Sequence, residues 1–423
     1  MTQENALPLS PTASAASRPA RLDRPPARLR TRLRVTAAGV ALLAATAVAA
    51  QTPPAAVADT SPAPAAATGL AGMPPLVDPH NVYAGAAANA FSPATAGALH
   101  RVYVPELRSN AVSVIDPETR KVVGHFPVGI NPQHIVPAWD LQTLWVTNNS
   151  ERRKDGSLTP IDPRTGLPGK PIAVDDPYNM YFMPDGSEAI VVAEAHERLD
   201  FRDPHTMALH SSLAVPGCKG INHADFSRDG RYAIFTCEFT AAIAKIDLVN
   251  RKVVGMIKLD GGGMPQDIRV SPDGAVFYVA DMMADGVFLV DGDRFVQIGK
   301  IPTGVGAHGL YPSRDGTQLY VANRGSNRVH GGHHGKGSVA VIDFASRKVV
   351  KIWPIPGGGS PDMGNVSADG KQLWLSGRFD DEVYVFDTDT GAVQRIAVGQ
   401  EPHGLTVWPQ PGRYSLGHTG NMR

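Results

Sequence analysis

Ile221 to Leu259 reads INHADFSRDGRYAIFTCEFTAAIAKIDLVNRKVVGMIKL, and this stretch decides the fold. It runs from a polar pair through an apolar strand, a Ser-x-Asp-Gly turn and a second strand. A third strand then ends in Ile-Asp, and a fourth begins at Arg-Lys-Val-Val. Val, Ile, Tyr and Phe suit the strands, and Asp229-Gly230 supplies a tight hairpin turn. The stretch therefore predicts one antiparallel sheet of four short strands.

The same pattern recurs at intervals of about 40 to 50 residues along the chain. A four-stranded sheet cannot bury both of its faces alone, but copies stacked around an axis bury them against one another. About seven copies fill the region from residue 80 to residue 400, which predicts an all-β, seven-bladed β-propeller. Clear further copies start at Met264, Ala307 and Pro361, weaker ones start at Pro132 and Pro177, and a partly degenerate one spans Arg101 to Val128.

Ring closure requires one strand from the other end of the chain. Residues 401–408, EPHGLTVW, look like an additional first strand with no blade behind it. We expect this C-terminal strand to complete the blade that begins at Arg101. Residues 80–92 compete for the same position.

The N-terminal residues are typical of an export signal. Residues 1–50 hold seven arginines followed by the apolar run VTAAGVALLAATAVAA, which ends in small residues. We interpret them as a signal peptide, residues 51–78 as a Pro/Ala-rich linker and residues 79–423 as the propeller. This organisation predicts a periplasmic or secreted protein with no stable membrane span after cleavage. The alternative is an uncleaved membrane anchor.

The net charge and the cysteine content limit which binding partners and which compartment we expect for the protein. Residues 1–50 contain two acidic residues beside their seven arginines, so the remaining chain has 33 basic and 38 acidic residues and a net charge of −5. This balance argues against a nucleic-acid partner. We expect a monomer whose partner is a small molecule or a periplasmic protein. Cys218 and Cys237, the two cysteines, are predicted to form a disulfide in an oxidising compartment.

Two segments resemble a known family. Leu144-Trp-Val-Thr-Asn148 and Tyr320-Val-Ala-Asn323 are similar to the YVTN-type repeat of YncE-like propeller proteins. The copies at 221 and 371 also resemble the haem domain of cytochrome-type nitrite reductase and its maturation proteins. The resemblance implies the propeller fold over about 320 residues. No Cys-x-x-Cys-His motif is present, so the cytochrome domain of the fused reductases is missing.

The starts of the inner strands are polar in every copy, which indicates a hydrogen-bonding channel mouth. Adjacent strand residues point to opposite faces, so we expect only one of two neighbouring sets to face the channel. Four histidines favour a ligand, metal or haem site, whereas the alternative is that these residues only pair loop backbones and water. The first set is Gln133, Tyr178, Asn222, Gln266, His308, Asp362 and His403, and the second is His134, Asn179, His223, Asp267, Gly309, Met363 and Gly404.

Two arginines and one loop add candidates near this mouth. Arg324 and Arg378 follow the second strands of consecutive blades and could clamp a carboxylate or phosphate, or else form surface ion pairs. The insertion NRVHGGHHGKG, residues 327–337, carries His330, His333 and His334, which could share a Zn or Cu ion. A flexible, solvated loop is the alternative. The predicted ligand-binding residues are His134, Asn179, His223, Asp267, His308, Asp362, His403, Arg324 and Arg378.

The sequence leaves the activity open between two classes of function. The first is an exported binding protein that holds a small ligand, cofactor or protein partner at the channel mouth. The second is a haem- or metal-associated oxidoreductase accessory or a metal-dependent, lactonase-like hydrolase. No Gly-x-Ser-x-Gly, His-Glu-x-x-His or Walker motif is present. The cofactor is unidentified, with haem and a divalent metal as the candidates.

The histidine-bearing mouth, rather than the opposite face with its generic Asp-Gly hairpins, is predicted to carry any functional site. Replacing His223 and His308 by alanine should lower the retention of ligand, metal or haem, measured beside the melting temperature. Unchanged binding in two folded variants would show that the mouth is only scaffolding.

Overall fold

The repeats form seven antiparallel sheets in the computed structural model, which describes residues 69–150, 155–418 and 420–423. We number the blades 1 to 7 along the chain and give the strands of each from the inside outward. Blade 1 contains β29 (Thr406–Trp408), β1 (Arg101–Glu106), β2 (Ala111–Asp116) and β3 (Lys121–Pro127). Blade 2 contains β4 (Pro132–Pro137), β5 (Leu144–Asn148), β6 (Ser157–Asp162), β7 (Leu167–Pro168) and β8 (Ile172–Ala173). Blade 3 contains β9 (Pro177–Phe182), β10 (Ala189–Ala193), β11 (Arg198–Arg202) and β12 (Leu209–Ala214).

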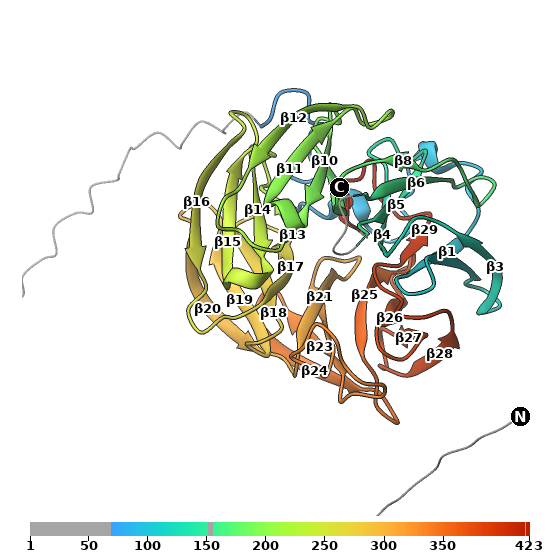
Figure 1. Ribbon diagram of the computed structural model, residues 1–423. Helices are drawn as coiled ribbons and strands as arrows, with labels where there is room; N and C mark the ends of the chain where they lie inside the picture. The colour runs from blue at the N-terminus through green and yellow to red at the C-terminus, as the bar shows by residue number, and fades with distance from the viewer. Residues whose placement is uncertain (1–68, 151–154, 419) are drawn as a thin grey trace, which may run out of the picture. The chain divides into compact units, whose positions relative to one another are not determined.

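The remaining four blades repeat this order around the ring (Figure 1). Blade 4 contains β13 (Ile221–Phe226), β14 (Tyr232–Cys237), β15 (Ala242–Asp247) and β16 (Lys252–Lys258). Blade 5 contains β17 (Pro265–Val270), β18 (Val276–Asp281), β19 (Gly286–Asp291) and β20 (Val296–Pro302). Blade 6 contains β21 (Ala307–Pro312), β22 (Gln318–Asn323), β23 (Ser338–Asp343) and β24 (Lys348–Pro354). Blade 7 contains β25 (Pro361–Val366), β26 (Gln372–Gly377), β27 (Glu382–Asp387) and β28 (Val393–Ala397).

Four short 3-10 helices accompany the strands of the described residues. Two of them, η1 (Ala84–Ala86) and η2 (Pro93–Thr95), precede the first blade. The other two, η3 (Glu194–His196) and η4 (Glu238–Thr240), connect the second and third strands of blades 3 and 4. No helix among the described residues has the length and apolarity to span a membrane. The predicted signal peptide, residues 1–50, lies outside the described residues.

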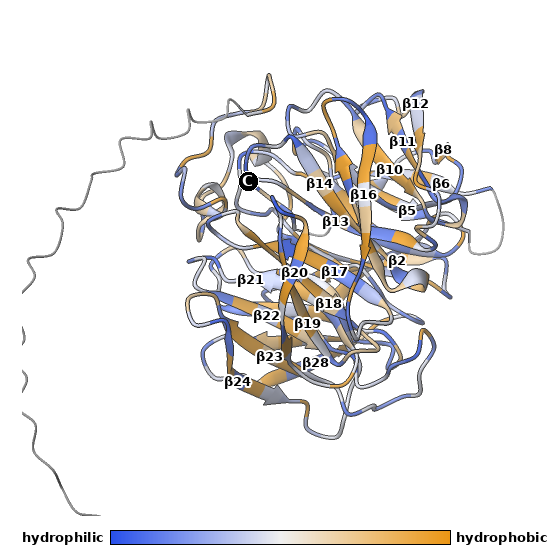
Figure 2. Cartoon of the chain, turned by 90° about the vertical axis from the view of Figure 1, so that its left-hand side faces the viewer, coloured by the Kyte–Doolittle hydropathy of each residue, from blue (hydrophilic) through white to orange (hydrophobic). Residues whose placement is uncertain are grey.

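The hydrophobic core is divided among the interfaces between blades. Each of seven clusters of buried side chains joins two neighbouring sheets. Tyr181 of blade 3, for example, packs with Phe226 and Phe235 of blade 4, and all three are fully buried. Hydrophobic residues follow the strands and hydrophilic residues follow the turns (Figure 2). The prediction that radial stacking buries the sheet faces is therefore confirmed.

The Ser-x-Asp-Gly turns fold as their chemistry dictates. Ser227 Oγ donates to Asp229 Oδ1 at 2.7 Å, and the same carboxylate oxygen accepts from the Arg231 amide at 3.1 Å. Gly230 has φ +70°, a conformation that side chains disfavour. The turn thus fixes the register of β13 and β14, and it recurs at Asp273, Asp315 and Asp369.

The C-terminal strand closes the ring. In β29, Val407 lies opposite Val102 and Thr406 lies opposite Tyr103 of β1, so chain segments 300 residues apart share blade 1 (Figure 1). The competing residues 80–92 form no blade strand and contain η1 instead. The predicted closure by residues 401–408 is confirmed.

The segment before the first blade lies across the face that carries the hairpin turns. Its amides at Leu70, Val82, Asn89 and Leu99 donate at 2.8 Å to backbone carbonyls in the turns of blades 4, 5, 7 and 2. Leu70 and Leu76 pack against core clusters, although composition assigns both to the linker. The described part of that linker, residues 69–78, therefore belongs structurally to the propeller.

Residues 409–423, which we call the tail hairpin, enter the central channel from the hairpin-turn face, which we call its lower end. Ser415 bridges to Met422, and the hairpin lies along β9, where Phe182 donates to the Leu416 carbonyl and His418 donates to the Met180 carbonyl, each at 3.0 Å. A Cβ at Gly417 would come within 2.3 Å of the Tyr181 Cα, so only glycine fits this approach. The tail hairpin thereby delivers His418 into the channel, where it is fully buried.

The predicted disulfide is confirmed. Cys218 lies just before β13 and Cys237 ends β14, with Cα atoms 4.7 Å apart and the two sulfurs bonded. The bond closes the hairpin of blade 4 at the channel mouth.

Deletion of residues 401–423 should cause aggregation or a large loss of melting temperature, because it leaves the edge of β1 unpaired and removes Trp408 and Val407 from the core. Deletion of residues 409–423 alone is the matched control and should cost less, since β29 remains. Thermal unfolding and gel filtration measure both. Equal melting of the full chain and the 401–423 deletion would contradict closure by β29.

Candidate functional site

A β-bulge shapes the channel mouth in each inner strand from β4 to β25. In blade 4, Ile221 pairs with Cys237 and Ala224 pairs with Phe235, so Asn222 and His223 together oppose one residue. The same one-residue irregularity occurs in blades 2, 3, 5, 6 and 7. A bulge rotates consecutive side chains toward the same side. The expectation that only one of the two polar sets faces the channel is therefore wrong for blades 2 to 5. In blades 6, 7 and 1 the second-set residues are Gly309, Met363, which packs in a hydrophobic core cluster, and Gly404.

Hydroxyl side chains on the second strands hold the bulges in place. Thr236 Oγ1 donates to Asn222 Oδ1 at 2.6 Å and accepts from the His223 amide at 3.1 Å. Thr147, the threonine of the Leu-Trp-Val-Thr-Asn segment, accepts from the His134 amide at 3.1 Å. The motif residue thus supports the bulge that aims two polar side chains per strand into the channel.

A polar cavity of about 370 Å³ lies at this mouth. Its walls come from the inner strands and from the loops that connect second and third strands, as the repeat predicts. The lining residues are Gln133, Asn149, Asp176, Tyr178, Glu194, Ala195, Glu238, Phe239, Gln266, His308, Arg324, Val329, His330, Arg378 and His403.

Arg324, His308 and Asp362 form a buried network beneath this cavity. Arg324 Nη2 donates to Asp362 Oδ1 at 2.8 Å and to His308 Nε2 at 2.6 Å, and His308 Nδ1 lies 2.9 Å from Asp362 Oδ1. Burial acts to raise the pKa of Asp362, but Arg324, His308 and His403 outweigh it and hold that pKa well below its ordinary value. Burial, together with Arg324, lowers the pKa of His308 to about 4. Arg324 is thus a neutralising partner of Asp362 rather than a surface ion pair.

Arg378 also lies at the channel mouth, but its surroundings differ from those of Arg324. It is 5% exposed, and its Nε and Nη1 atoms have no hydrogen-bond partner among the described residues. The Oε1 atom of Gln133, which lines the same cavity, also has none. A buried guanidinium group with unpaired N–H groups is costly unless a ligand supplies acceptors.

A group of histidines fills the channel below the cavity. His134 and His223, from blades 2 and 4, have ring centres 5.3 Å apart, and His418 of the tail hairpin lies 5.2 and 4.7 Å from them. His418 Nε2 is 3.5 Å from Asp267 Oδ1, which also accepts from Arg269 Nη1 at 3.0 Å. Burial lowers the pKa of His134 to about 3 and takes the pKa values of His223 and His418 well below the ordinary range. These histidine rings are therefore uncharged, and each ring has one nitrogen that carries no proton.

The structure brings together all nine residues predicted to bind a ligand. Each is at most 5% exposed, and seven blade-borne residues meet around the channel axis while Arg324 and Arg378 reach it from loops. Their role in ligand binding stays a prediction. The residues are His134, Asn179, His223, Asp267, His308, Asp362, His403, Arg324 and Arg378.

The three loop histidines do not converge on one point. His330 lines the mouth cavity, whereas His333 Nδ1 and His334 Nδ1 lie 4.0 and 3.8 Å from Asp380 Oδ1 and are more than half exposed. The predicted three-histidine metal site in this loop has no geometric support in the described residues. Its glycine-rich chain spreads the side chains instead of gathering them.

Two residues of the channel, His418 and Arg269, were not predicted from the sequence. His418 follows the last strand and belongs to no repeat, so no alignment on the Asp-Gly turn could place it in the channel. Arg269 lies two residues beyond the aligned positions, on the fully buried part of β17. Its charge among apolar strand residues was the available signal, because an arginine inside a buried strand requires a buried carboxylate partner.

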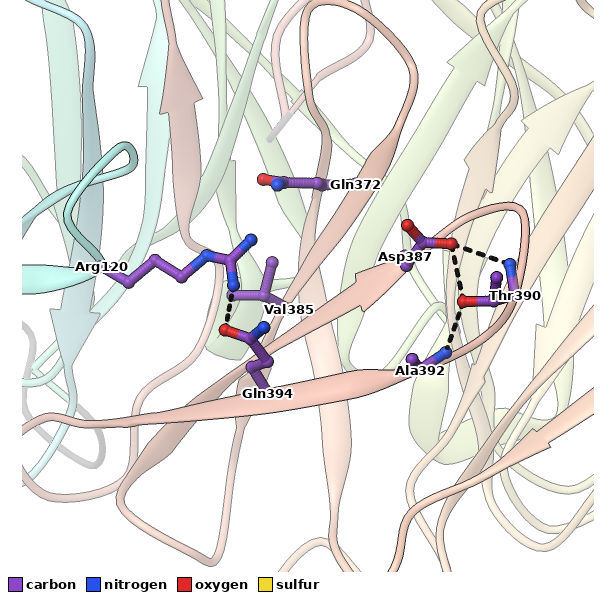
Figure 3. A pocket seen from close by; sticks show the side chains of 7 residues that line it. All are labelled: Arg120, Gln372, Val385, Asp387, Thr390, Ala392 and Gln394. Atoms are coloured by element: carbon purple, nitrogen blue, oxygen red, sulfur yellow. Dashed lines mark hydrogen bonds between the residues drawn. The ribbon is translucent and has the colours of Figure 1, made fainter.

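A second cavity of about 180 Å³ lies at the edge of blades 7 and 1 (Figure 3). Arg120 donates to Gln394 there, and Asp387 accepts from the Thr390 amide and hydroxyl. Most of the polar side chains shown in Figure 3 are thus paired with one another. This second cavity is therefore a weaker candidate for a ligand-binding site than the cavity at the mouth.

Comparison with known proteins agrees with the fold. The chain is 26% identical over 190 residues to Antigen Lp49 of Leptospira interrogans serogroup Icterohaemorrhagiae serovar copenhageni, which covers 39% of this chain and 38% of that relative's length. The periplasmic gluconolactonase PpgL of Pseudomonas aeruginosa superposes with a TM-score of 0.58 at 20% identity, covering 72% of this chain and 98% of that chain. The dihydro-heme d1 dehydrogenase NirN in complex with DHE superposes with a TM-score of 0.54 at 16% identity, covering 74% and 76%.

At these identities the structural likeness shows the fold alone. The family profile of the YNCE-like beta-propellers matches residues 58–411, which includes all seven blades. The chain therefore belongs to the YNCE-like beta-propeller family.

Proposed function

We propose that this protein is an exported binding protein that holds a small, oxygen-rich anion in the mouth of its channel. The observation that carries this proposal is the buried, incompletely paired guanidinium group of Arg378 beside the 370 Å³ cavity. Export is supported by the signal-like residues 1–50 and by the fold shared with a periplasmic gluconolactonase. A protein partner at the mouth is the other binding candidate.

Arg378 favours a carboxylate or a phosphate as the ligand group. Its Nε and Nη1 atoms need acceptors, and a carboxylate or phosphate offers two parallel ones in the geometry of the guanidinium fork. Arg324 lies in the next blade but is already paired with Asp362. Arg378 is therefore the guanidinium group with N–H groups left for a ligand, and it shares its positive charge with Glu238 in the same cavity.

The rest of the wall suits hydroxyl groups. Gln133 presents an unpaired Oε1 acceptor, and Glu238 is held by Asn222 Nδ2 at 2.9 Å. Burial raises the pKa of Glu238, against the opposing effect of Gln266 and Arg324, so its carboxyl group gains protons more readily than an exposed one. Amide and carboxyl groups together match the donors and acceptors of a sugar acid.

A haem group fits this mouth poorly. Its broad faces need apolar walls, but among the fifteen lining residues only Ala195, Phe239 and Val329 are aliphatic or plain aromatic. His308 Nε2 is also engaged by Arg324, and its Nδ1 atom lies 2.9 Å from Asp362 Oδ1. We therefore assign no role to haem in this site.

Lactone hydrolysis is the second candidate function, and His403 favours it. This side chain lines the cavity, its Nδ1 atom has no hydrogen-bond partner among the described residues, and its Nε2 atom is 3.5 Å from Asp362 Oδ2. Burial and Arg378 keep the pKa of His403 well below its ordinary value, so the ring is neutral but a weaker base than an exposed imidazole. The Asp362 carboxylate opposes this shift and would have to support uptake of a proton from water. Asp362 would orient the ring for that step.

Calorimetric titration with D-gluconate, inorganic phosphate and D-glucose tests the binding proposal. We expect at least one of the two anions to bind and neutral glucose to bind weakly. Arg378→Met should weaken anion binding by about tenfold or more, since a charge-assisted hydrogen bond is lost. Arg120→Met, in the second cavity, is the matched control and should bind as the original protein does. Absence of anion binding, or equal binding by all three proteins, would overturn the proposal.

The same proteins separate binding from hydrolysis. Release of acid from D-glucono-1,5-lactone in a pH-stat should exceed the buffer rate only if the second candidate is correct. His403→Gln should then abolish the excess while gluconate binding persists. A rate equal to that of buffer alone would eliminate hydrolysis of this lactone and leave the binding proposal standing.

A further inference from the structure

The lower channel gathers metal-ligating side chains that the mouth cavity does not use. Within the described residues, two sets of three groups place their ligand atoms within 4.8 Å of one another: His223, Asp267 and His418, and His308, Asp362 and His403. All six side chains are buried. We propose that the first set, His223, Asp267 and His418, binds one divalent transition-metal ion such as Zn²⁺ or Cu²⁺.

The separation of the imidazole rings supports coordination of one ion. With metal–nitrogen bonds of about 2.0–2.1 Å, two imidazoles on one ion have ring centres roughly 5 Å apart. The rings of His223 and His418 are 4.7 Å apart. His134 lies 5.3 and 5.2 Å from them, which closes a triangle of three imidazoles over the site. Two nitrogen donors and one carboxylate form a set that zinc and copper favour over calcium or magnesium.

Neighbouring groups already orient the proposed ligands. His223 Nδ1 lies 3.2 Å from the Asn179 amide, while its Nε2 has no hydrogen-bond partner among the described residues. In the structure Asn179 Nδ2 faces His223 Nδ1, and Asn179 Oδ1 accepts from the Met180 amide at 2.9 Å. Binding of an ion at Nε2 therefore requires the proton on Nδ1 and rotation of the Asn179 amide group. Asp267 accepts from the Ile268 amide at 2.8 Å and the Leu310 amide at 2.9 Å, which fixes the carboxylate in the channel.

The upper set is a poorer metal site because Arg324 occupies it. This guanidinium group donates both to Asp362 Oδ1 and to His308 Nε2, so it takes up two of the three prospective ligands and adds a positive charge. In the lower set, Arg269 also adds a positive charge and donates to Asp267 Oδ1 at 3.0 Å, but among the described residues it takes up only this one of the three prospective ligands. A second carboxylate, Asp225, acts electrostatically on Arg269 and pairs with Arg423 at 3.2 Å. Of the two histidines, His223 keeps its Nε2 atom without a hydrogen-bond partner among the described residues.

The ion would tie the tail hairpin to the blades. His223 comes from β13, Asp267 comes from β17 and His418 comes from residues after the last strand. A ligand that binds only the folded arrangement stabilises it. Metal binding at this point therefore opposes the release of residues 409–423 from the channel.

The test uses the full chain after treatment with EDTA, followed by titration with Zn²⁺ and, as a spectroscopic probe, Cu²⁺. We expect one equivalent per chain by atomic emission, a melting temperature several degrees higher, and Cu²⁺ electron paramagnetic resonance with coupling to imidazole nitrogens. Absence of stoichiometric binding of either ion by the original protein would overturn the proposal. The Cu²⁺ spectrum needs no variant, so it tests the site even if substitutions in the channel unfold the protein.

Variants then locate the ion. His418→Asn and His223→Asn should each abolish stoichiometric binding, with folding checked by melting without metal. His333→Asn and His334→Asn, in the exposed loop, are the matched controls and should retain one equivalent. Full binding by folded His418→Asn, or loss of binding in the loop variants, would overturn the assignment and place the ion elsewhere.

Discussion

The structure depends on pairing the channel-facing edges of its inner strands. Each innermost strand has one edge bonded to its own blade and one edge facing the axis, where no further strand exists. Unpaired backbone amides at this depth would be costly, so neighbouring inner strands supply acceptors across the blade boundaries. The acceptors are Tyr181 for the Ala224 amide, Asp225 for Val270, Asp267 for Leu310, Tyr311 for Gly364 and Asn365 for Val407.

Two positions in this ring use backbone instead of side chains. The Ile135 amide of β4 donates to the Gly404 carbonyl, and the Phe182 amide of β9 donates to the Leu416 carbonyl of the tail hairpin. Polar residues in the channel therefore divide into two groups. The side chains of Asp225, Tyr311 and Asn365 accept hydrogen bonds from inner-strand amides and so hold the strands together. In the described part of the chain, the histidine side chains and Arg378 do not serve as such acceptors. Asp267 does both, because it pairs with a strand amide and faces His418.

The fold could be predicted from sequence because its determinants are local and repeated. Asp-Gly turns, alternating strand residues and the orphan segment 401–408 each carry their own chemistry, and seven copies reinforce one another. The polar mouth followed from aligning those copies. The bulge at positions such as Asn222 and His223 was not predicted, because it depends on Thr236 across the hairpin, although the two consecutive polar residues interrupt the strand alternation. The position of His418 could not be predicted either, because it depends on packing of the tail hairpin against β9, which is distant in the sequence.

Residues 69–100 and the tail hairpin both contact the propeller on the side away from the mouth cavity. A molecule beside Arg378 exchanges with solvent directly. His418, by contrast, is fully buried. Since residues 409–423 follow every blade in the chain, the group of His134, His223 and His418 is assembled only after all seven blades have been synthesised.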